Sequence, residues 1–88
     1  MKCTHLIASG RVQGVSFRDN TRKKAVALGL HGYAKNLEDG NAEVVAQGPE
    51  EKIKELIIFI RKGPGIAKVT DIKMKHKEIE SFDNFNVY

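Results

Sequence analysis

The stretch Gly10–Arg18, GRVQGVSFR, combines two glycines and an arginine in an arrangement that suits anion binding. Gly10 and Gly14 allow a tight turn that directs successive main-chain N–H groups inward, and such concavities bind anions. Arg18 falls in the first turn of an expected helix, where free N–H groups and the helix dipole add positive potential. Its guanidinium can hold phosphate through two parallel hydrogen bonds, which lysine cannot do. The stretch therefore predicts a phosphate-binding loop, with an ordinary tight turn and a surface arginine as the structural alternative.

Asn36 is the second residue whose position suggests chemistry. It ends the short segment GYAKN, directly before the turn formed by Asp39 and Gly40. An asparagine at the end of a strand presents an amide with both donors and acceptors. It either takes part in a site or satisfies the main chain of the hairpin turn.

Two helices are expected from apolar residues that recur at spacings of three and four. The first begins at Ser16, a suitable N-cap residue, and stops at Gly29. The second has Pro49 in its first position and stops at Gly63. Their apolar faces consist of Phe17, Thr21, Ala25 and Leu28 in the first helix, and of Ile53, Leu56, Ile57 and Ile60 in the second.

The remaining segments read as strands, because they are short, alternate in polarity or are bounded by turn residues. They cover residues 4–9, 32–36, 42–48 and 70–76, with a last short strand around Phe85 and Val87. The Asp39-Gly40 pair predicts a hairpin between the second and third strands. The order β-α-β-β-α-β predicts a ferredoxin-like α+β sandwich, with an antiparallel sheet, two helices on one face and a short C-terminal strand.

Length and composition limit the function classes. The 88 residues are 41% hydrophobic, which predicts one globular domain over residues 1–88. The formal net charge of +4 comes from dispersed lysines and arginines, so binding to nucleic acid is not expected. Cys3 is the only cysteine, which excludes an internal disulfide and fits a reducing compartment. No segment approaches the length of a membrane span or a signal-peptide core, and we expect a cytoplasmic, complete and monomeric protein.

GRVQGVSFR and GYAKN, in this order, resemble the two signatures of the acylphosphatase family. The similarity continues through DGNAEVVAQGPEEKIKELIIFIRKGPGIAKV and covers essentially the whole chain. The resemblance implies a ferredoxin-like fold and hydrolysis of acyl phosphates, which are small molecules, to a carboxylate and inorganic phosphate. It implies neither a metal nor an organic cofactor.

The resemblance also implies roles for particular residues. Arg18 would bind the phosphate of the substrate, and Asn36 would orient the attacking water. The phosphate would also be held by the main-chain amides of Gln13, Gly14, Val15, Ser16 and Phe17. The sequence departs from the family at Ser16, where a bulkier and often aromatic residue is usual. Because this position lies within the loop, the departure concerns the shape of the pocket.

Other readings of the chain have less support in the sequence. An RNA-binding sheet would use exposed aromatic residues, and GYAKN lacks such a pattern. A domain that binds phosphate without turnover is a further alternative, but it would not need both Arg18 and Asn36. His5, His31 and His76 have no metal-ligand spacing, and Cys3 has no evident base beside it.

Overall fold

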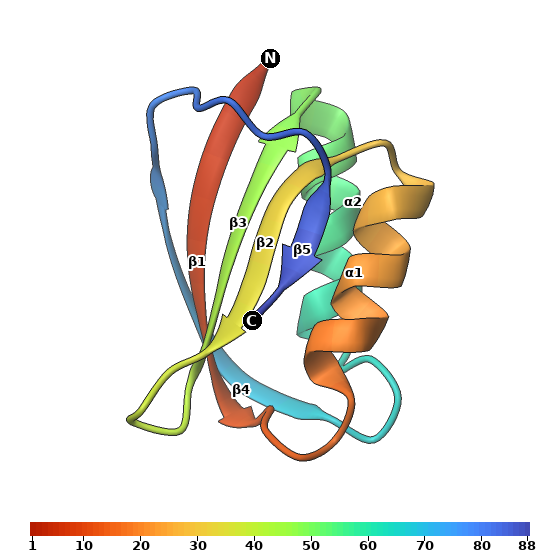
Figure 1. The fold of residues 1–88 in the computed structure, drawn as a ribbon. Coiled ribbons are helices and arrows are strands. Elements are labelled where there is room, and N and C mark those ends of the chain that lie inside the picture. Colours follow the sequence, from red (N-terminus) through yellow and green to blue (C-terminus); the bar gives the residue numbers. More distant parts are fainter.

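The computed structural model describes all 88 residues and confirms the ferredoxin-like prediction. A five-stranded sheet has the order β4-β1-β3-β2-β5, and both helices cover one of its faces (Figure 1). The elements are β1 (Lys2–Arg11), α1 (Phe17–Ala27), β2 (His31–Asn36), β3 (Ala42–Gly48), α2 (Glu50–Arg61), β4 (Lys68–His76) and β5 (Phe85–Val87).

The sheet is mixed, whereas the sequence predicted an antiparallel one. Strands β4, β1, β3 and β2 pair antiparallel, as predicted, but β5 runs parallel to β2, with Phe85 opposite Gly32. The pairing is extended by a hydrogen bond from the Tyr88 N–H to the Ala34 carbonyl, at 2.9 Å. The chain leaves β4 at one end of the sheet and crosses to its opposite edge, so β5 enters beside β2 in the same direction (Figure 1).

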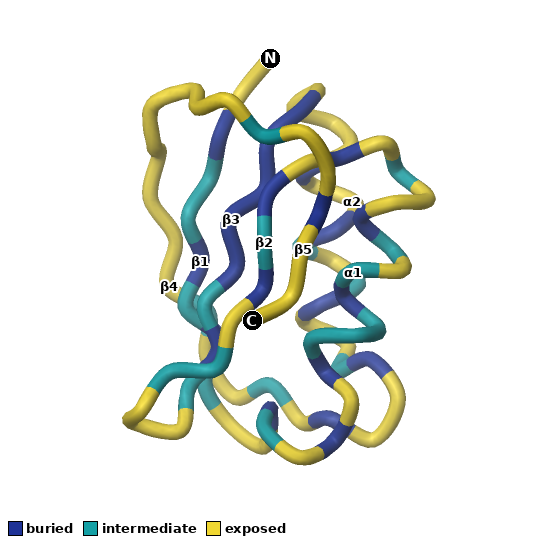
Figure 2. The backbone as a smooth tube through the Cα atoms, viewed as in Figure 1, coloured by how far each residue is buried: buried dark blue, intermediate teal, exposed yellow.

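The core lies between the sheet and the two helices, and Figure 2 shows its buried residues as dark blue segments of the backbone. The expected apolar faces form it, since Phe17, Thr21 and Ala25 of α1 are buried, as are Ile53, Leu56 and Ile60 of α2. Leu28 and Ile57, which were expected on the same faces, are only partly buried. The sheet contributes one face of β3, on which Ala42, Val44 and Ala46 are fully buried.

The ends of the two helices differ slightly from the sequence-based expectation. Ser16 occupies the N-cap position of α1, but its hydroxyl forms no capping hydrogen bond. Pro49 precedes α2 as its N-cap residue and is not the first helical residue. The hairpin at Asp39 and Gly40 is confirmed, since β2 and β3 pair antiparallel up to Asn36 and Ala42. No helix in the structure has the length and apolar character needed to cross a membrane.

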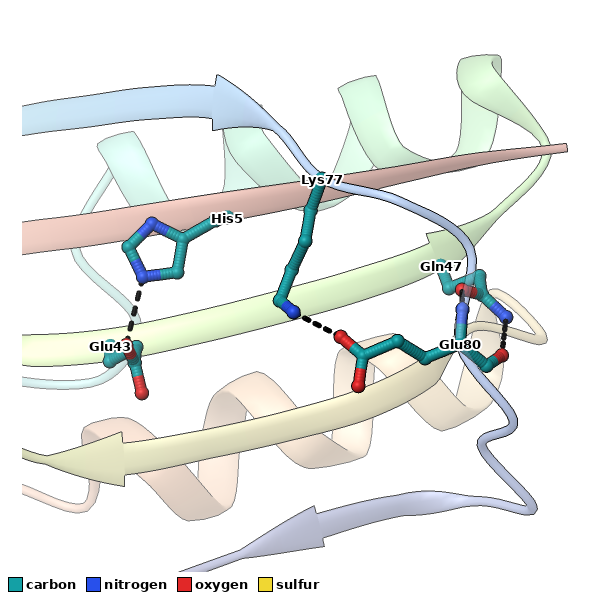
Figure 3. A network of polar contacts seen from close by, with 5 residues as sticks. All are labelled: His5, Glu43, Gln47, Lys77 and Glu80. Atoms are coloured by element: carbon teal, nitrogen blue, oxygen red, sulfur yellow. Dashed lines mark hydrogen bonds and ion pairs between the residues drawn. The ribbon is translucent and has the colours of Figure 1, made fainter.

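Residues 77–84 cover part of the sheet face that carries no helix. The side chain of Gln47 in β3 makes two hydrogen bonds with the main chain of Glu80, both at 2.8 Å (Figure 3). Lys77 pairs with the carboxylate of Glu80 across the same segment. Because residues 77–84 cover them, Cys3 and Gln47 are only 2% and 7% exposed. This part of the sheet face is therefore shielded from solvent.

The burial of Cys3 leads to a testable expectation about its reactivity. Desolvation raises the pKa of the Cys3 thiol above its usual value, and the negative charge of Glu80 raises it further. Only the thiolate reacts with alkylating reagents, so a higher pKa lowers the reactive fraction at a given pH. We expect iodoacetamide at pH 8 to modify the folded protein more slowly than the urea-unfolded chain. Equal rates in the two states would contradict this account.

Candidate active site

The Gly10–Phe17 loop runs from the last two residues of β1 to the first residue of α1, at the end of the molecule opposite the N-terminus, and the β2–β3 hairpin lies at the same end (Figure 1). Val12, Val15 and Phe17 are buried in the core, whereas Gly14 and Ser16 are exposed. The loop is therefore fixed in place by its apolar side chains. Such anchoring holds the main chain in one conformation, which a binding site made of main-chain groups needs.

The main-chain N–H groups of Gln13 to Phe17 are free to bind an external acceptor. None of these five groups donates a hydrogen bond to a main-chain carbonyl. The first N–H groups of α1 have no partner within the helix, and Ser16 offers no side-chain cap. Five consecutive unpaired donors next to a helix N-terminus form a suitable binding site for an oxyanion.

Two positions in this loop depend on unusual main-chain geometry. Gly14 has a φ of 72°, in the left-handed region. Gly10 has a φ of 118°, and the pairing register of β1 and β4 shifts between Ser9 and Gly10. A Cβ atom at Gly10 would lie 2.2 Å from the carbonyl oxygen of Lys68, so no side chain fits there. The glycines predicted to shape the loop do so through a positive φ and through close contact with β4.

Ser16 adopts a φ of 61° and is the only non-glycine residue with a positive φ. An L-residue in this region costs about 1–2 kcal/mol relative to its right-handed conformation. We expect Ser16→Gly to leave the free energy of unfolding unchanged or to raise it by up to about 1 kcal/mol, as measured by urea denaturation. The control Ser9→Gly lies in β1 and should lower the same quantity by about 0.5–1 kcal/mol. A destabilisation by Ser16→Gly as large as that of the control would contradict this assignment of strain.

Arg18 lies in the first turn of α1, as predicted, beside an open hollow of about 390 Å³. Its Nη1 donates a hydrogen bond of 2.6 Å to the main-chain oxygen of Tyr88. The guanidinium has five N–H donors, so this contact leaves others for a ligand. The hollow is lined by Val12, Gly14, Ser16, Phe17, Arg18, Asp19 and Val87. The contribution of β5 and Tyr88 to this region was not apparent in the sequence.

Asp19 brings a negative charge to the same hollow, and two cations on α1 compensate it. Its carboxylate lies 3.1 Å from Nζ of Lys23 and 3.1 Å from Nη2 of Arg22. The hydrogen bond with Lys23, followed by that with Arg22, lowers the pKa of Asp19 below its usual value. Asp19 is therefore ionised at neutral pH and is not a proton donor to a ligand.

Asn36 lies at the end of β2, opposite Ala42, and does not line the hollow beside Arg18. Its side-chain Oδ1 is buried and has no hydrogen-bond partner in the protein. Buried polar atoms without a partner are uncommon and costly, and they often mark sites that receive a ligand or water. The side chain of Gln13 joins the Gly10–Phe17 loop to the residues on either side of this hairpin turn, through Leu37 and Asn41. That contact could not be predicted from the sequence, because it joins positions 24 and 28 residues apart.

The other titratable residues considered in the sequence lie outside this region. His5 pairs with Glu43 at 2.8 Å on the sheet face away from the helices (Figure 3). Cys3 is buried beneath residues 77–84. No group of three or more His, Cys, Asp or Glu side chains is arranged so that it could hold a metal ion.

The chain is similar to known proteins both in sequence and in structure. Residues 4–87 match the family model Acylphosphatase. A protein of Caldanaerobacter subterraneus subsp. tengcongensis named acylphosphatase is 46% identical over 88 residues, which cover 99% of this chain and 98% of that protein.

Two solved structures give the same result. The crystal structure of acylphosphatase from Bacillus subtilis has a TM-score of 0.96 at 34% identity and covers 100% of this chain and 99% of the other. The structure of an acylphosphatase from Coxiella burnetii has a TM-score of 0.94 at 39% identity, covering 99% and 92%. Sequence and structure agree over nearly the whole length, and the chain belongs to the acylphosphatase family of hydrolases.

Proposed function

We propose that this protein hydrolyses the bond between the carboxyl group and the phosphate of small acyl phosphates, without a metal ion. The observation that carries the proposal is the row of unpaired N–H groups from Gln13 to Phe17, directly followed by Arg18. These groups offer a concentrated set of donors and one fixed positive charge to a phosphoryl group. Membership of the acylphosphatase family supports the same substrate class.

The chemistry of the substrate explains why such a site suffices. The leaving group is a carboxylate, which is stable as an anion and needs no strong general acid. Phosphoryl transfer passes through a loose transition state with charge on the equatorial oxygens. Fixed main-chain donors and Arg18 stabilise that charge, and one such donor contributes about 3 kcal/mol.

Asn36 has a separate role in this proposal. Its amide cannot take a proton at neutral pH, so it positions the attacking water rather than acting as a base. The buried and unpaired Oδ1 is available to accept a hydrogen bond from that water. The water oxygen forms a bond to phosphorus as the bond from phosphorus to the carboxylate oxygen breaks, and the water proton passes to a phosphoryl oxygen. A pH–rate profile that required an enzyme group titrating near neutral pH would contradict this proton path.

The direct test is the hydrolysis of benzoyl phosphate by the purified protein in excess EDTA. We expect turnover at the same rate as in magnesium-containing buffer, with competitive inhibition by inorganic phosphate. Loss of turnover in EDTA that magnesium restores would overturn the metal-free mechanism. Phosphate binding without turnover under both conditions would overturn the enzymatic function and leave a phosphate-binding module.

RNA binding by the sheet is not expected. Tyr33 is the aromatic side chain of β2 on the face away from the helices, and it packs edge-on against Phe82 at 6.2 Å and Tyr88 at 5.7 Å between ring centres. These contacts occupy the ring that would otherwise stack on a base. Filter binding with random single-stranded RNA at low salt should detect no complex. A complex with steep salt dependence would instead favour the RNA-binding reading.

We also propose that the protein acts as a single-domain monomer in the cytoplasm. The unpaired and buried thiol of Cys3 supports a reducing compartment. Size-exclusion chromatography with light scattering should give one species at 9.8 kDa. A larger species that persists on dilution would contradict the monomer.

A further inference from the structure

The side chain of Gln13 makes two contacts with the hairpin that follows Asn36. Its Nε2 donates to the carbonyl of Leu37 at 2.8 Å and to the carbonyl of Asn41 at 3.0 Å. Leu37 directly follows Asn36, and Asn41 directly precedes Ala42, which pairs with Asn36 in the sheet. The side-chain amide of Gln13 thus bridges the two arms of the hairpin, one residue beyond the Asn36–Ala42 pair.

The two carbonyls belong to the narrow base of the turn, which we call the hairpin neck and define as Leu37 and Asn41. The Leu37 N–H donates to the Asn41 carbonyl at 2.9 Å, and the Gly40 N–H donates to the Leu37 carbonyl at 3.2 Å. Each carbonyl therefore accepts one hydrogen bond from within the hairpin and one from Gln13. Only a group with two donor hydrogens can serve both carbonyls at once, and a side-chain NH₂ is such a group.

We propose that Gln13 is a positioning residue that sets the location of Asn36 relative to the bound phosphate. The inference rests on the proposed function, because it assigns to Gln13 the link between the two parts of the proposed site, the phosphate-binding loop and Asn36. The main chain of Gln13 belongs to the row of free donors that would bind the phosphate. Its side chain holds the neck of the hairpin that carries Asn36. One residue thus fixes the distance between the phosphate and the water-orienting amide.

The need for such a link follows from the topology. The loop leaves β1 and the hairpin joins β2 to β3, so the two halves of the site come from different strands of the sheet. Asn36 sits at the last pair of the β2–β3 ladder, and beyond that pair the hairpin is held by the two main-chain hydrogen bonds of its neck and by Gln13. A misplacement of about 1 Å can slow a reaction by about 10²-fold. A direct hydrogen-bonded connection between the loop and the hairpin restricts their movement relative to each other.

The test uses Gln13→Met, which keeps the length of the side chain and removes both donors without adding charge. We expect kcat for benzoyl phosphate to fall by about 10- to 100-fold. The inhibition constant for inorganic phosphate should stay within about twofold, because the main-chain donors and Arg18 remain. Gln47→Met is the matched control, since Gln47 also makes two hydrogen bonds with a distant main-chain segment. It lies away from the site and should leave kcat unchanged.

A double variant separates this inference from the proposed function. If Gln13 acts through Asn36, Gln13→Met added to Asn36→Ala should lower kcat by less than about twofold further. An equal fall in both backgrounds would overturn the positioning role while leaving the function intact. An unchanged kcat in Gln13→Met, or a loss of phosphate affinity that accounts for its whole effect, would overturn the positioning role as well. If Asn36→Ala alone keeps full activity, the proposed role of Asn36 fails, and with it this inference.

Thermal melting and amide exchange complete the test. Folding of each variant is verified first by thermal melting. Hydrogen exchange at the Leu37 N–H should be faster in Gln13→Met than in the native protein and unchanged in Gln47→Met. Should Gln13→Met not fold, Gln13→Asn provides the same comparison, because its shorter side chain cannot serve both carbonyls in place. Native exchange and native kcat in that variant would overturn the proposal.

Discussion

Replacing Asn36 by alanine is expected to slow turnover severely while the protein stays folded and continues to bind phosphate. Positioning of the attacking water contributes up to about 7–11 kcal/mol in favourable cases, so a fall in kcat of about 10³-fold or more is expected. The inhibition constant for inorganic phosphate should change little, because the donors of Gln13–Phe17 and the guanidinium of Arg18 are untouched. Steady-state kinetics with benzoyl phosphate measure both quantities.

The same substitution should not destabilise the fold. Oδ1 of Asn36 is buried without a hydrogen-bond partner, and a buried unsatisfied group costs about 1–3 kcal/mol. Its removal should leave the free energy of unfolding unchanged or higher, as measured by urea denaturation. This combination of lost activity and retained stability is characteristic of a residue kept for function.

Asn41→Ala is the matched control, because it is the same substitution in the same hairpin. The Asn41 side chain bonds only to Asp39, and its link to Gln13 uses the main-chain carbonyl, which alanine retains. We expect kcat within about twofold of the native value for this control. Equal losses in the two variants would show that the hairpin matters as a whole and that Asn36 has no individual role.

The sequence could predict most of the fold because the relevant signals are local. Apolar spacing located both helices, and short alternating segments bounded by turn residues located the strands. Helices and hairpins leave such patterns because neighbouring residues determine them. The Gly10–Arg18 stretch was informative for the same reason, since two glycines, a helix start and an arginine follow one another directly.

What the sequence could not predict depends on contacts between distant segments. The parallel pairing of β5 is decided by the path of residues 77–84 across the sheet, and that path has no local signature. The hydrogen bond from Arg18 to Tyr88 joins residues 70 positions apart, and that from Gln47 to Glu80 joins residues 33 apart. The side-chain role of Gln13 belongs to this class, because its partners became visible only when the loop and hairpin were placed together.

Replacing Arg18 should damage binding and chemistry together, in contrast to Asn36. An arginine that stabilises a phosphoryl transition state contributes about 10³- to 10⁵-fold. We expect Arg18→Ala to lower kcat/KM for benzoyl phosphate by at least about 10³-fold and to weaken inhibition by inorganic phosphate. Lys54→Ala removes an equal charge and serves as the control, because Lys54 lies in α2 beside a hollow that it shares with Lys2, at the N-terminal end of the molecule.

Arg18→Lys distinguishes the geometry of the guanidinium from its charge. Nη1 of Arg18 is held by the main-chain oxygen of Tyr88, which leaves Nε and Nη2 to contact two oxygens of the phosphate side by side. A lysine has one nitrogen, so it cannot keep the Tyr88 contact and present a planar pair of donors at the same time. We expect Arg18→Lys to retain part of the phosphate affinity but to lose about 10²- to 10³-fold in kcat. Native kcat in Arg18→Lys would mean that a positive charge alone suffices. The contact with Tyr88 would then not be needed to orient the guanidinium toward the phosphate in the transition state.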